Sequence, residues 1–186
     1  MNKIAIYSGS FNPLHIGHLA IMKQMTEKEG FDCVYLIVSP KNPLKDGISS
    51  NSGPERFSAA QQAVQRHPEL KVKVDDIELN MPEPHYTIRT LDALREREPG
   101  NTFTLIMGAD NLAGIRRWKD YTRILTEYGV AVHPREGDDL TQIKQSLLAE
   151  NPAFKIQIIN APLVTVSSTQ IREAMQRGED VSHLLM

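Results

Sequence analysis

The sequence predicts an α/β fold with a doubly wound parallel sheet, contained in a single domain that spans residues 1–186. Short apolar segments alternate with segments of helical periodicity along the whole chain. The run VYLIV at residues 34–38 is continuously apolar, as expected for a parallel strand that helices cover on both faces. A chain of 186 residues without internal repeats, low-complexity tracts or a long linker has the length of one domain.

The first half of the chain opens with a strand, a glycine-containing turn and a helix. The alternation resumes after a loop rich in Pro, Asn, Ser, Gly and Lys, which is long enough to be a binding loop or a lid. The expected elements are a strand at Lys3–Ser8, a helix at Ile16–Glu29, a strand at Asp32–Ser39, the loop at Pro40–Gly53, a helix at Pro54–Arg66, a strand at Lys71–Val74 and an extended piece at Ile77–Leu79.

The second half continues the same alternation. Helical periodicity is clearest where Ile88, Leu91 and Leu94 share one face. The expected elements are a helix at Thr87–Glu98, a strand at Thr102–Met107, a helical region around Trp118 that ends at Glu127, a strand at Gly129–His133, a helix at Asp139–Glu150, a strand at Lys155–Ile159 and a last helix from Ser168.

Composition excludes several classes of partner. The chain carries 21 basic and 23 acidic residues, so it lacks the positive field that binds a long nucleic acid. No apolar run approaches the roughly 18 residues of a membrane span, and the N-terminal segment does not have the pattern of a signal peptide. The single cysteine, Cys33, lies in the apolar run CVYLIV and is expected to be a structural thiol. We therefore expect a cytoplasmic protein with small-molecule partners; the sequence leaves open whether it forms a homo-oligomer.

The segment SGSFNPLHIGH, residues 8–18, directly follows the first strand. Ligands of a doubly wound sheet bind outside the carboxyl ends of its strands, which is where this segment lies. The small residues Ser8, Gly9 and Ser10 let a phosphate approach the backbone, and Gly17 leaves room for a ligand against the helix. His15 and His18 are spaced to share one face of the helix near its N-terminus, where negative charge is favoured. Two imidazoles there suit the charge that develops when a phosphate attacks a phosphorus atom and pyrophosphate leaves.

Neither this motif nor a second one is decisive alone. The histidine pair also fits two ordinary histidines or a metal pair, although no third metal ligand is evident. The segment VSSTQIREAM, residues 166–175, places good N-cap residues before a helix and Arg172 one turn later, which offers several donors to a phosphate. The same pattern is typical of a capped helix with a surface arginine.

Together, G-S-F-N-P-x-H-x-G-H and S-S-T-x-I-R resemble the motifs of the nucleotidylyltransferase superfamily, whose fold is Rossmann-like. The letters HIGH also occur in the related class I aminoacyl-tRNA synthetases, but no lysine follows Lys155 here to form a KMSKS-like loop. The segments HYTIRTL, residues 85–91, and MGADNLAGIRRWKDY, residues 107–121, are similar to those of bacterial nicotinate-nucleotide adenylyltransferases, which join nicotinate mononucleotide to ATP.

The resemblance implies roles for particular residues and a Mg²⁺ ion that ATP carries, without a metal site of the protein's own. Trp118 would stack on the pyridine ring, and Asp110 would accept hydrogen bonds from ribose hydroxyls, although core burial and a helix cap are the alternatives for these two. The implied catalytic residues are His15, His18, Lys45 and Arg172. The implied ATP-binding residues are Gly9, Ser10, Phe11, Gly17, His18, Gly108, Asp110, Ser167, Ser168, Thr169 and Arg172. The implied pyridine nucleotide-binding residues are Ser10, Lys45, Tyr86, Thr87, Asp110, Trp118 and Arg135.

The chain departs from the family pattern in two places. Asn12 stands where the family commonly has Asp, and the loop reads NPLK, residues 42–45, in place of Pro-Pro-His-Lys, with Leu44 at the histidine position. Arg56 and Arg135 match arginines common in the family, but each also fits a solvated surface charge.

Two other functions stay open at this stage. One is an adenylyltransferase for phosphopantetheine or a CTP-dependent transferase for a polyol phosphate, although such relatives lack the GADNL and Trp-Lys combination. The other is a nucleotide-binding sensor that does not turn over. The side chains do not decide between nicotinate and nicotinamide as the pyridine.

Overall fold

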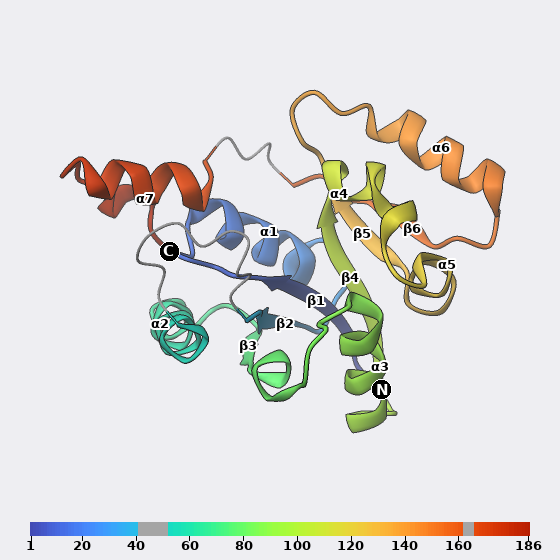
Figure 1. Cartoon of the computed structure of the whole chain (residues 1–186), viewed down its shortest axis with the longest axis horizontal. Helices are drawn as coiled ribbons and strands as arrows, with labels where there is room; N and C mark the ends of the chain where they lie inside the picture. The colour runs from blue at the N-terminus through green and yellow to red at the C-terminus, as the bar shows by residue number, and fades with distance from the viewer. Residues whose placement is uncertain (41–51, 162–165) are drawn as a thin grey trace.

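The structure is a computed structural model that describes residues 1–40, 52–161 and 166–186 (Figure 1). It contains a six-stranded sheet in the order β3-β2-β1-β4-β5-β6, with every neighbouring pair parallel. The order reverses between β1 and β4, which confirms the predicted doubly wound sheet. The strands are β1 (Lys3–Gly9), β2 (Cys33–Val38), β3 (Val72–Asp75), β4 (Thr102–Gly108), β5 (Val130–His133) and β6 (Ile156–Ile158).

Helices cover both faces of this sheet, as the buried apolar strands require; Figure 1 shows α1 and α3 on opposite sides of β1. The α-helices are α1 (Ile16–Glu27), α2 (Gly53–Gln65), α3 (Thr87–Arg97), α4 (Ala109–Ala113), α5 (Tyr121–Arg123), α6 (Leu140–Glu150) and α7 (Ser168–Gln176). Short 3₁₀ or π turns are η2 (Ile77–Asn80), η3 (Ile115–Arg117), η4 (Ile124–Tyr128) and η5 (Ser182–Leu184).

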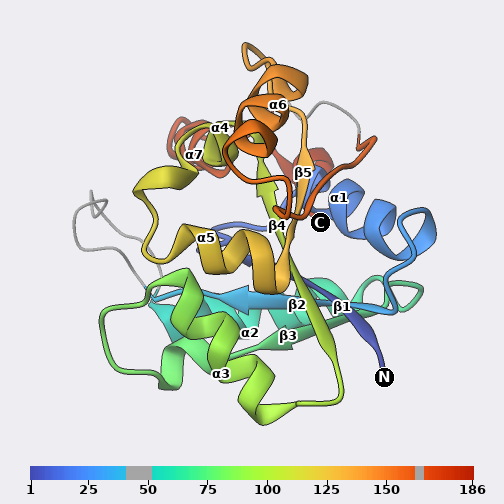
Figure 2. The same cartoon turned by 90° about the vertical axis from the view of Figure 1, so that its right-hand side faces the viewer.

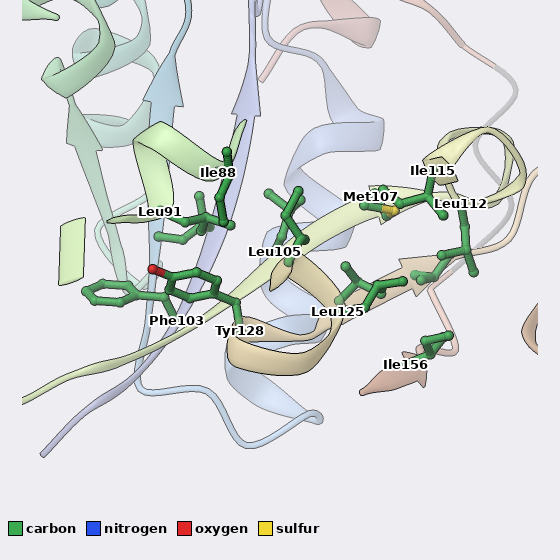
Figure 3. Packing of buried hydrophobic residues seen from close by; sticks show 14 of the residues in the cluster. Ile88, Leu91, Phe103, Leu105, Met107, Leu112, Ile115, Leu125, Tyr128 and Ile156 are labelled. Carbon is green, nitrogen blue, oxygen red and sulfur yellow. The ribbon is translucent and has the colours of Figure 1, made fainter. Parts of the chain in front are cut away.

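Two apolar clusters hold the layers together, one on each face of the sheet. Ile21 and Met22 of α1 belong to the first cluster and are almost completely buried. Figure 3 shows the second, in which Leu91 of α3 and Tyr128 of η4 lie near Phe103 of β4. Because strand residues alternate between the faces, β1 and β4 supply side chains to both clusters.

The predicted extended piece at Ile77–Leu79 is wrong, because residues 77–80 form the 3₁₀ turn η2. The Asp75 carboxylate accepts the Ile77 N–H at 3.0 Å, which turns the chain directly after β3. The helical region expected around Trp118 is broken into α4, η3, α5 and η4, and Trp118 itself has extended backbone. Figure 2 shows α3 and α5 side by side, where Arg123 pairs with Asp92 at 3.0 Å.

No helix within the described ranges is long and apolar enough to cross a membrane. Cys33 is half-buried rather than fully buried, and burial raises the pKa of its thiol, which disfavours the reactive thiolate.

Asp75, the last residue of β3, is a buried acidic residue. Its side chain is 2% exposed and lies 2.6 Å from a guanidinium nitrogen of Arg97 at the end of α3. Burial by itself raises the pKa of this carboxyl, but the hydrogen bonds and charge of Arg97, the Ile77 N–H and the charge of Lys73 together hold the pKa below its ordinary value. The pair therefore ties α3 to the sheet.

We expect Asp75→Asn to lower the free energy of unfolding at pH 7 by about 1.5–3 kcal/mol, the size of a hydrogen bond to a charged group. The depressed folded-state pKa makes this stabilisation complete above the unfolded pKa of about 3.9 and lost as the pH falls through the folded value. Urea unfolding of both proteins at pH 7 and pH 3 tests this. A difference of equal size at both pH values would contradict it.

Candidate active site

The turn between β1 and α1 is held by groups from distant parts of the chain. Backbone carbonyls of residues 9–14 accept hydrogen bonds from other elements, so the turn's path is fixed from outside. Figure 1 shows α7 beside the start of α1, where two of these bonds form. The bonds run from Ser39 N to Gly9 O at 2.9 Å, from Arg56 to Ser10 O at 2.9 Å, from Arg172 to Asn12 O, from Ser168 Oγ to Pro13 O at 2.9 Å and from Met186 N to Leu14 O at 3.5 Å.

His15 and His18 cap the helix that leaves this turn. His15 is the N-cap of α1, and its Nδ1 accepts the Gly17 N–H at 3.0 Å. His18 Nδ1 accepts the His15 N–H at 3.1 Å, which completes a reciprocal capping box. The two rings stack with centroids 3.7 Å apart, so the imidazoles share one face as the sequence predicts. The edge of His18 also packs against Phe11, whose ring centroid lies 5.1 Å away.

Both imidazoles are neutral at pH 7. Burial, followed by the charge of Arg135, lowers the pKa of His15 to about 4. Burial lowers the pKa of His18 to about 3, with further contributions from His15, His133 and Arg135. Since each Nδ1 accepts a backbone N–H, each neutral ring carries its proton on Nε2. The pair therefore offers two N–H donors.

These donors belong to a cavity of about 290 Å³ at the carboxyl ends of the central strands. It combines small residues and backbone of the first turn with the ends of β4 and β5 and the start of α7. The predicted residues in its lining are Gly9, Ser10, Phe11, His15, Gly17, His18, Gly108, Arg135, Ser167 and Ser168. The α7 N-terminus carries its own capping box, in which Ser167 Oγ accepts the Gln170 N–H at 3.1 Å. The cavity thus joins two capped helix N-termini, a favourable surrounding for phosphates.

Gly108 ends β4 at the point where three polar side chains converge. A Cβ on this residue would lie 2.6 Å from Asp110 Oδ1 and 3.1 Å from both Arg135 Nε and His133 Cε1. Asp110 and Arg135 approach each other at 3.5 Å. Gly108 is therefore required for this convergence, as a residue without a side chain.

Known proteins resemble the chain in sequence and in fold. Residues 6–174 match the cytidylyltransferase-like family. A probable nicotinate-nucleotide adenylyltransferase of Flavobacterium johnsoniae is 37% identical over 98% of this chain and 91% of its own length. The corresponding proteins of Flavobacterium psychrophilum, covered to 91%, and Bacteroides fragilis, covered to 87%, are 39% and 38% identical over 98% of this chain. The chain belongs to the nicotinate-nucleotide adenylyltransferase family, within the cytidylyltransferase-like proteins.

Solved structures agree with this family in fold. The nicotinic acid mononucleotide adenylyltransferase of Plasmodium falciparum, complexed with NaAD, has a TM-score of 0.76 and 20% identity over 97% of this chain and 87% of its own. A putative nicotinate-nucleotide adenylyltransferase of Vibrio parahaemolyticus has a TM-score of 0.66 and 21% identity, with 100% of this chain and 94% of that chain covered. The Rossmann-like nucleotidylyltransferase fold is therefore established.

Some residues that the family resemblance implicates lie outside the cavity lining. Of the residues that the structure describes, these are Tyr86, Thr87, Asp110, Trp118, Thr169 and Arg172. Lys45, together with the departure at Leu44, lies outside the described residues. Tyr86 is 44% exposed, and Lys119 Nζ lies 5.5 Å from its ring centroid, so the segment after η3 approaches the start of α3. Trp118 is half-buried against the core cluster, and its pyridine-stacking role stays a prediction.

Arg56 and Arg172 both donate hydrogen bonds to other parts of the protein. Arg56 is 2% exposed and donates to Ser39 O at 2.7 Å, so the alternative of a solvated surface charge is wrong. Arg172 donates to Asn12 O and, at 3.2 Å, to Thr169 Oγ1. The Arg172 guanidinium must release these two oxygens before all of its N–H groups can donate to a phosphate.

Sequence reasoning missed several lining residues. They are Tyr7, Ile21, Ile106, Met107, Asn111, His133 and Val166. His133 ends β5, so its place at the carboxyl edge of a predicted strand could have identified it. Burial, and next the charge of Arg135, lowers its pKa, which leaves a third neutral imidazole at the cavity.

We expect Gly108→Ala to weaken ATP binding roughly tenfold or more, because the new methyl group would displace Asp110 and Arg135. Gly114→Ala is the matched control, since its Cβ would have its nearest neighbours at 4.0 Å. Calorimetric titration with ATP measures both. Similar affinities for the two variants would show that the convergence at Gly108 does not matter for the nucleotide.

Acid should destabilise the fold through His15 and His18. Their folded pKa values of about 4 and about 3 lie below the unfolded value, so the unfolded chain binds more protons as the pH falls from about 6.5 to 4. Stability that is present above pH 6.5 is lost over this range. His18→Asn keeps an acceptor for the His15 N–H and does not titrate, so we expect its melting temperature to depend less on pH. The exposed His183→Asn should behave like wild type, and indistinguishable curves for all three proteins would contradict this account.

Proposed function

We propose that the chain transfers the adenylyl group of ATP to nicotinate mononucleotide, which gives deamido-NAD and pyrophosphate, a reaction of NAD biosynthesis. The observation that carries the proposal is the stacked pair of neutral imidazoles at the N-terminus of α1. The full-length relatives that are named as probable nicotinate-nucleotide adenylyltransferases support the substrate.

Transfer would take place in line and without a covalent enzyme intermediate. A 5′-phosphate oxygen of the mononucleotide forms a bond to the α-phosphorus of ATP, and the bond to the bridging oxygen of the β-phosphate breaks. Pyrophosphate leaves with that electron pair. The Nε2–H groups of His15 and His18 would donate to oxygens whose negative charge grows in the transition state. Neutral imidazoles fit this role because each already carries one N–H and can donate without binding a further proton.

The remaining cavity residues would hold the nucleotide. The backbone around Gly9 and Ser10 and the start of α7 would face the phosphates. Asp110, which lies beside Gly108 but outside the cavity lining, would accept from the ribose. We propose that Tyr86, Thr87 and Trp118 surround the pyridine, and that Lys45 and Arg172 reach the β- and γ-phosphates, Arg172 after it releases Asn12 O.

Magnesium would enter with ATP and be held by phosphate oxygens and water. Over the described ranges, no three His, Cys, Asp or Glu side chains lie close enough to hold a metal ion. Since its substrates are metabolites of the cytoplasm, we propose that the enzyme works there.

The test is product formation by the purified protein with ATP and Mg²⁺ and with nicotinate mononucleotide, nicotinamide mononucleotide or phosphopantetheine in parallel. We expect deamido-NAD as the preferred product. We also expect His18→Asn to lower kcat about 10²–10³-fold, the cost of losing one preorganised donor, while it stays folded because its side-chain oxygen replaces Nδ1. Product from phosphopantetheine alone would overturn the assigned substrate, and an unchanged kcat in His18→Asn would overturn the role of His18.

A further inference from the structure

We propose that Glu78 is a positioning residue that joins the wall of the ATP cavity to the pyridine-binding segment and so sets the affinity for the mononucleotide. Glu78 lies on η2, beyond β3, and is 5% exposed. It does not line the cavity among the described residues, and no motif of the sequence points to it. The inference rests on the proposed function.

One oxygen of Glu78 accepts from two elements. Its Oε2 lies 3.0 Å from Thr90 Oγ1 on α3 and 3.3 Å from Ser8 Oγ at the end of β1. Separating a buried carboxylate from its hydroxyl donors is costly, because these hydrogen bonds replace those that water would make to its lone pairs. The two hydroxyls are therefore kept at a fixed separation.

The carboxylate also fixes the direction of the hydrogen bonds. Ser8 donates to Glu78, so its proton is not available to Ser39, whose Oγ lies 3.1 Å from Ser8 Oγ. Ser39 must then be the donor of that pair. The result is an ordered chain from Ser39 through Ser8 to Glu78, with Thr90 donating from the other side.

The two ends of this chain lie at the two proposed substrate sites. Ser8 lines the cavity with the imidazole pair. The Thr90 N–H donates to Tyr86 O at 3.3 Å, which places Thr90 one helical turn after the proposed pyridine segment. Ser8 is also held by the sheet through its register with Ile37, whereas the start of α3 is not part of the sheet. Loss of the Glu78 link should therefore move the α3 N-terminus and leave the ATP cavity in place.

Thr90→Val tests this link from a residue that is 2% exposed and does not line the described cavity. Valine has the shape of threonine without its hydroxyl, and Thr90→Ser is the matched control that keeps the donor. We expect Thr90→Val to raise KM for nicotinate mononucleotide about tenfold, the effect of one hydrogen bond to a charged group, with little change in KM for ATP. Thr90→Ser should have wild-type KM values for both substrates.

A double-mutant cycle with Glu78→Gln tests whether the pair acts as a unit. We expect the change in KM of the double variant to be smaller than the product of the single changes, because both substitutions act on the same charge-assisted hydrogen bond. Equal KM values for Thr90→Val and Thr90→Ser would overturn the positioning role of Glu78. Multiplicative changes of KM in the cycle would overturn it as well. Calorimetric binding of nicotinate mononucleotide to wild type and Thr90→Val gives the same comparison without turnover. An absence of deamido-NAD from wild type would count against the proposed function alone.

Discussion

His15 and His18 accept backbone N–H groups of the first turn of α1 through Nδ1, and these two hydrogen bonds fix the protonation state of the site. A protonated ring has no lone pair for such a bond, so folding itself selects the neutral form. The remaining proton is on Nε2 of each ring. The same contacts that start the helix thus prepare two donors for a reaction that accumulates negative charge on phosphate oxygens.

The turn before the helix explains why distant residues matter to this pair. Its carbonyls accept from Ser39 directly after β2, from α2, from α7 and from the last residue of the chain, so the position of His15 depends on packing throughout the domain. Phe11 adopts a φ of 49°, a left-handed value that costs a non-glycine residue free energy. Burial of its ring against Tyr7 and His18 offsets this cost. Strain in the backbone is thereby coupled to the placement of an imidazole.

The fold could be predicted where a single pattern decides the structure. Continuous apolar runs such as VYLIV identified parallel strands, and the alternation of elements identified the doubly wound sheet. The 3₁₀ turn at residues 77–80 was missed because an Asp75 hydrogen bond, rather than an apolar pattern, bends the chain there. Likewise, Trp118 lies between two short helical pieces whose breaks have no signal in hydrophobic spacing.

The site divides in the same way. Residues within a motif at a helix start, such as Gly17 and Ser167, could be placed because the helix start dictates their surroundings. Arg172 could not, since its partner Asn12 is 160 positions away and only the tertiary structure shows that the guanidinium is occupied by a carbonyl.

The burial of Glu78 could not be predicted from the hydrophobic pattern of the sequence. A glutamate between apolar residues suggests a solvated edge, yet this one is buried because Ser8 and Thr90 replace its water. The Glu78 carboxylate accepts hydrogen bonds from β1 and from α3 at the same time. It therefore constrains the position of α3 relative to β1 through side chains. An enzyme that joins two nucleotides needs such a constraint, because the attacking phosphate must stay aligned with the α-phosphorus to within a fraction of an ångström. We propose that the alignment of the two substrate sites in this fold depends on the Glu78 carboxylate and on the hydroxyls of Ser8 and Thr90 that it holds together.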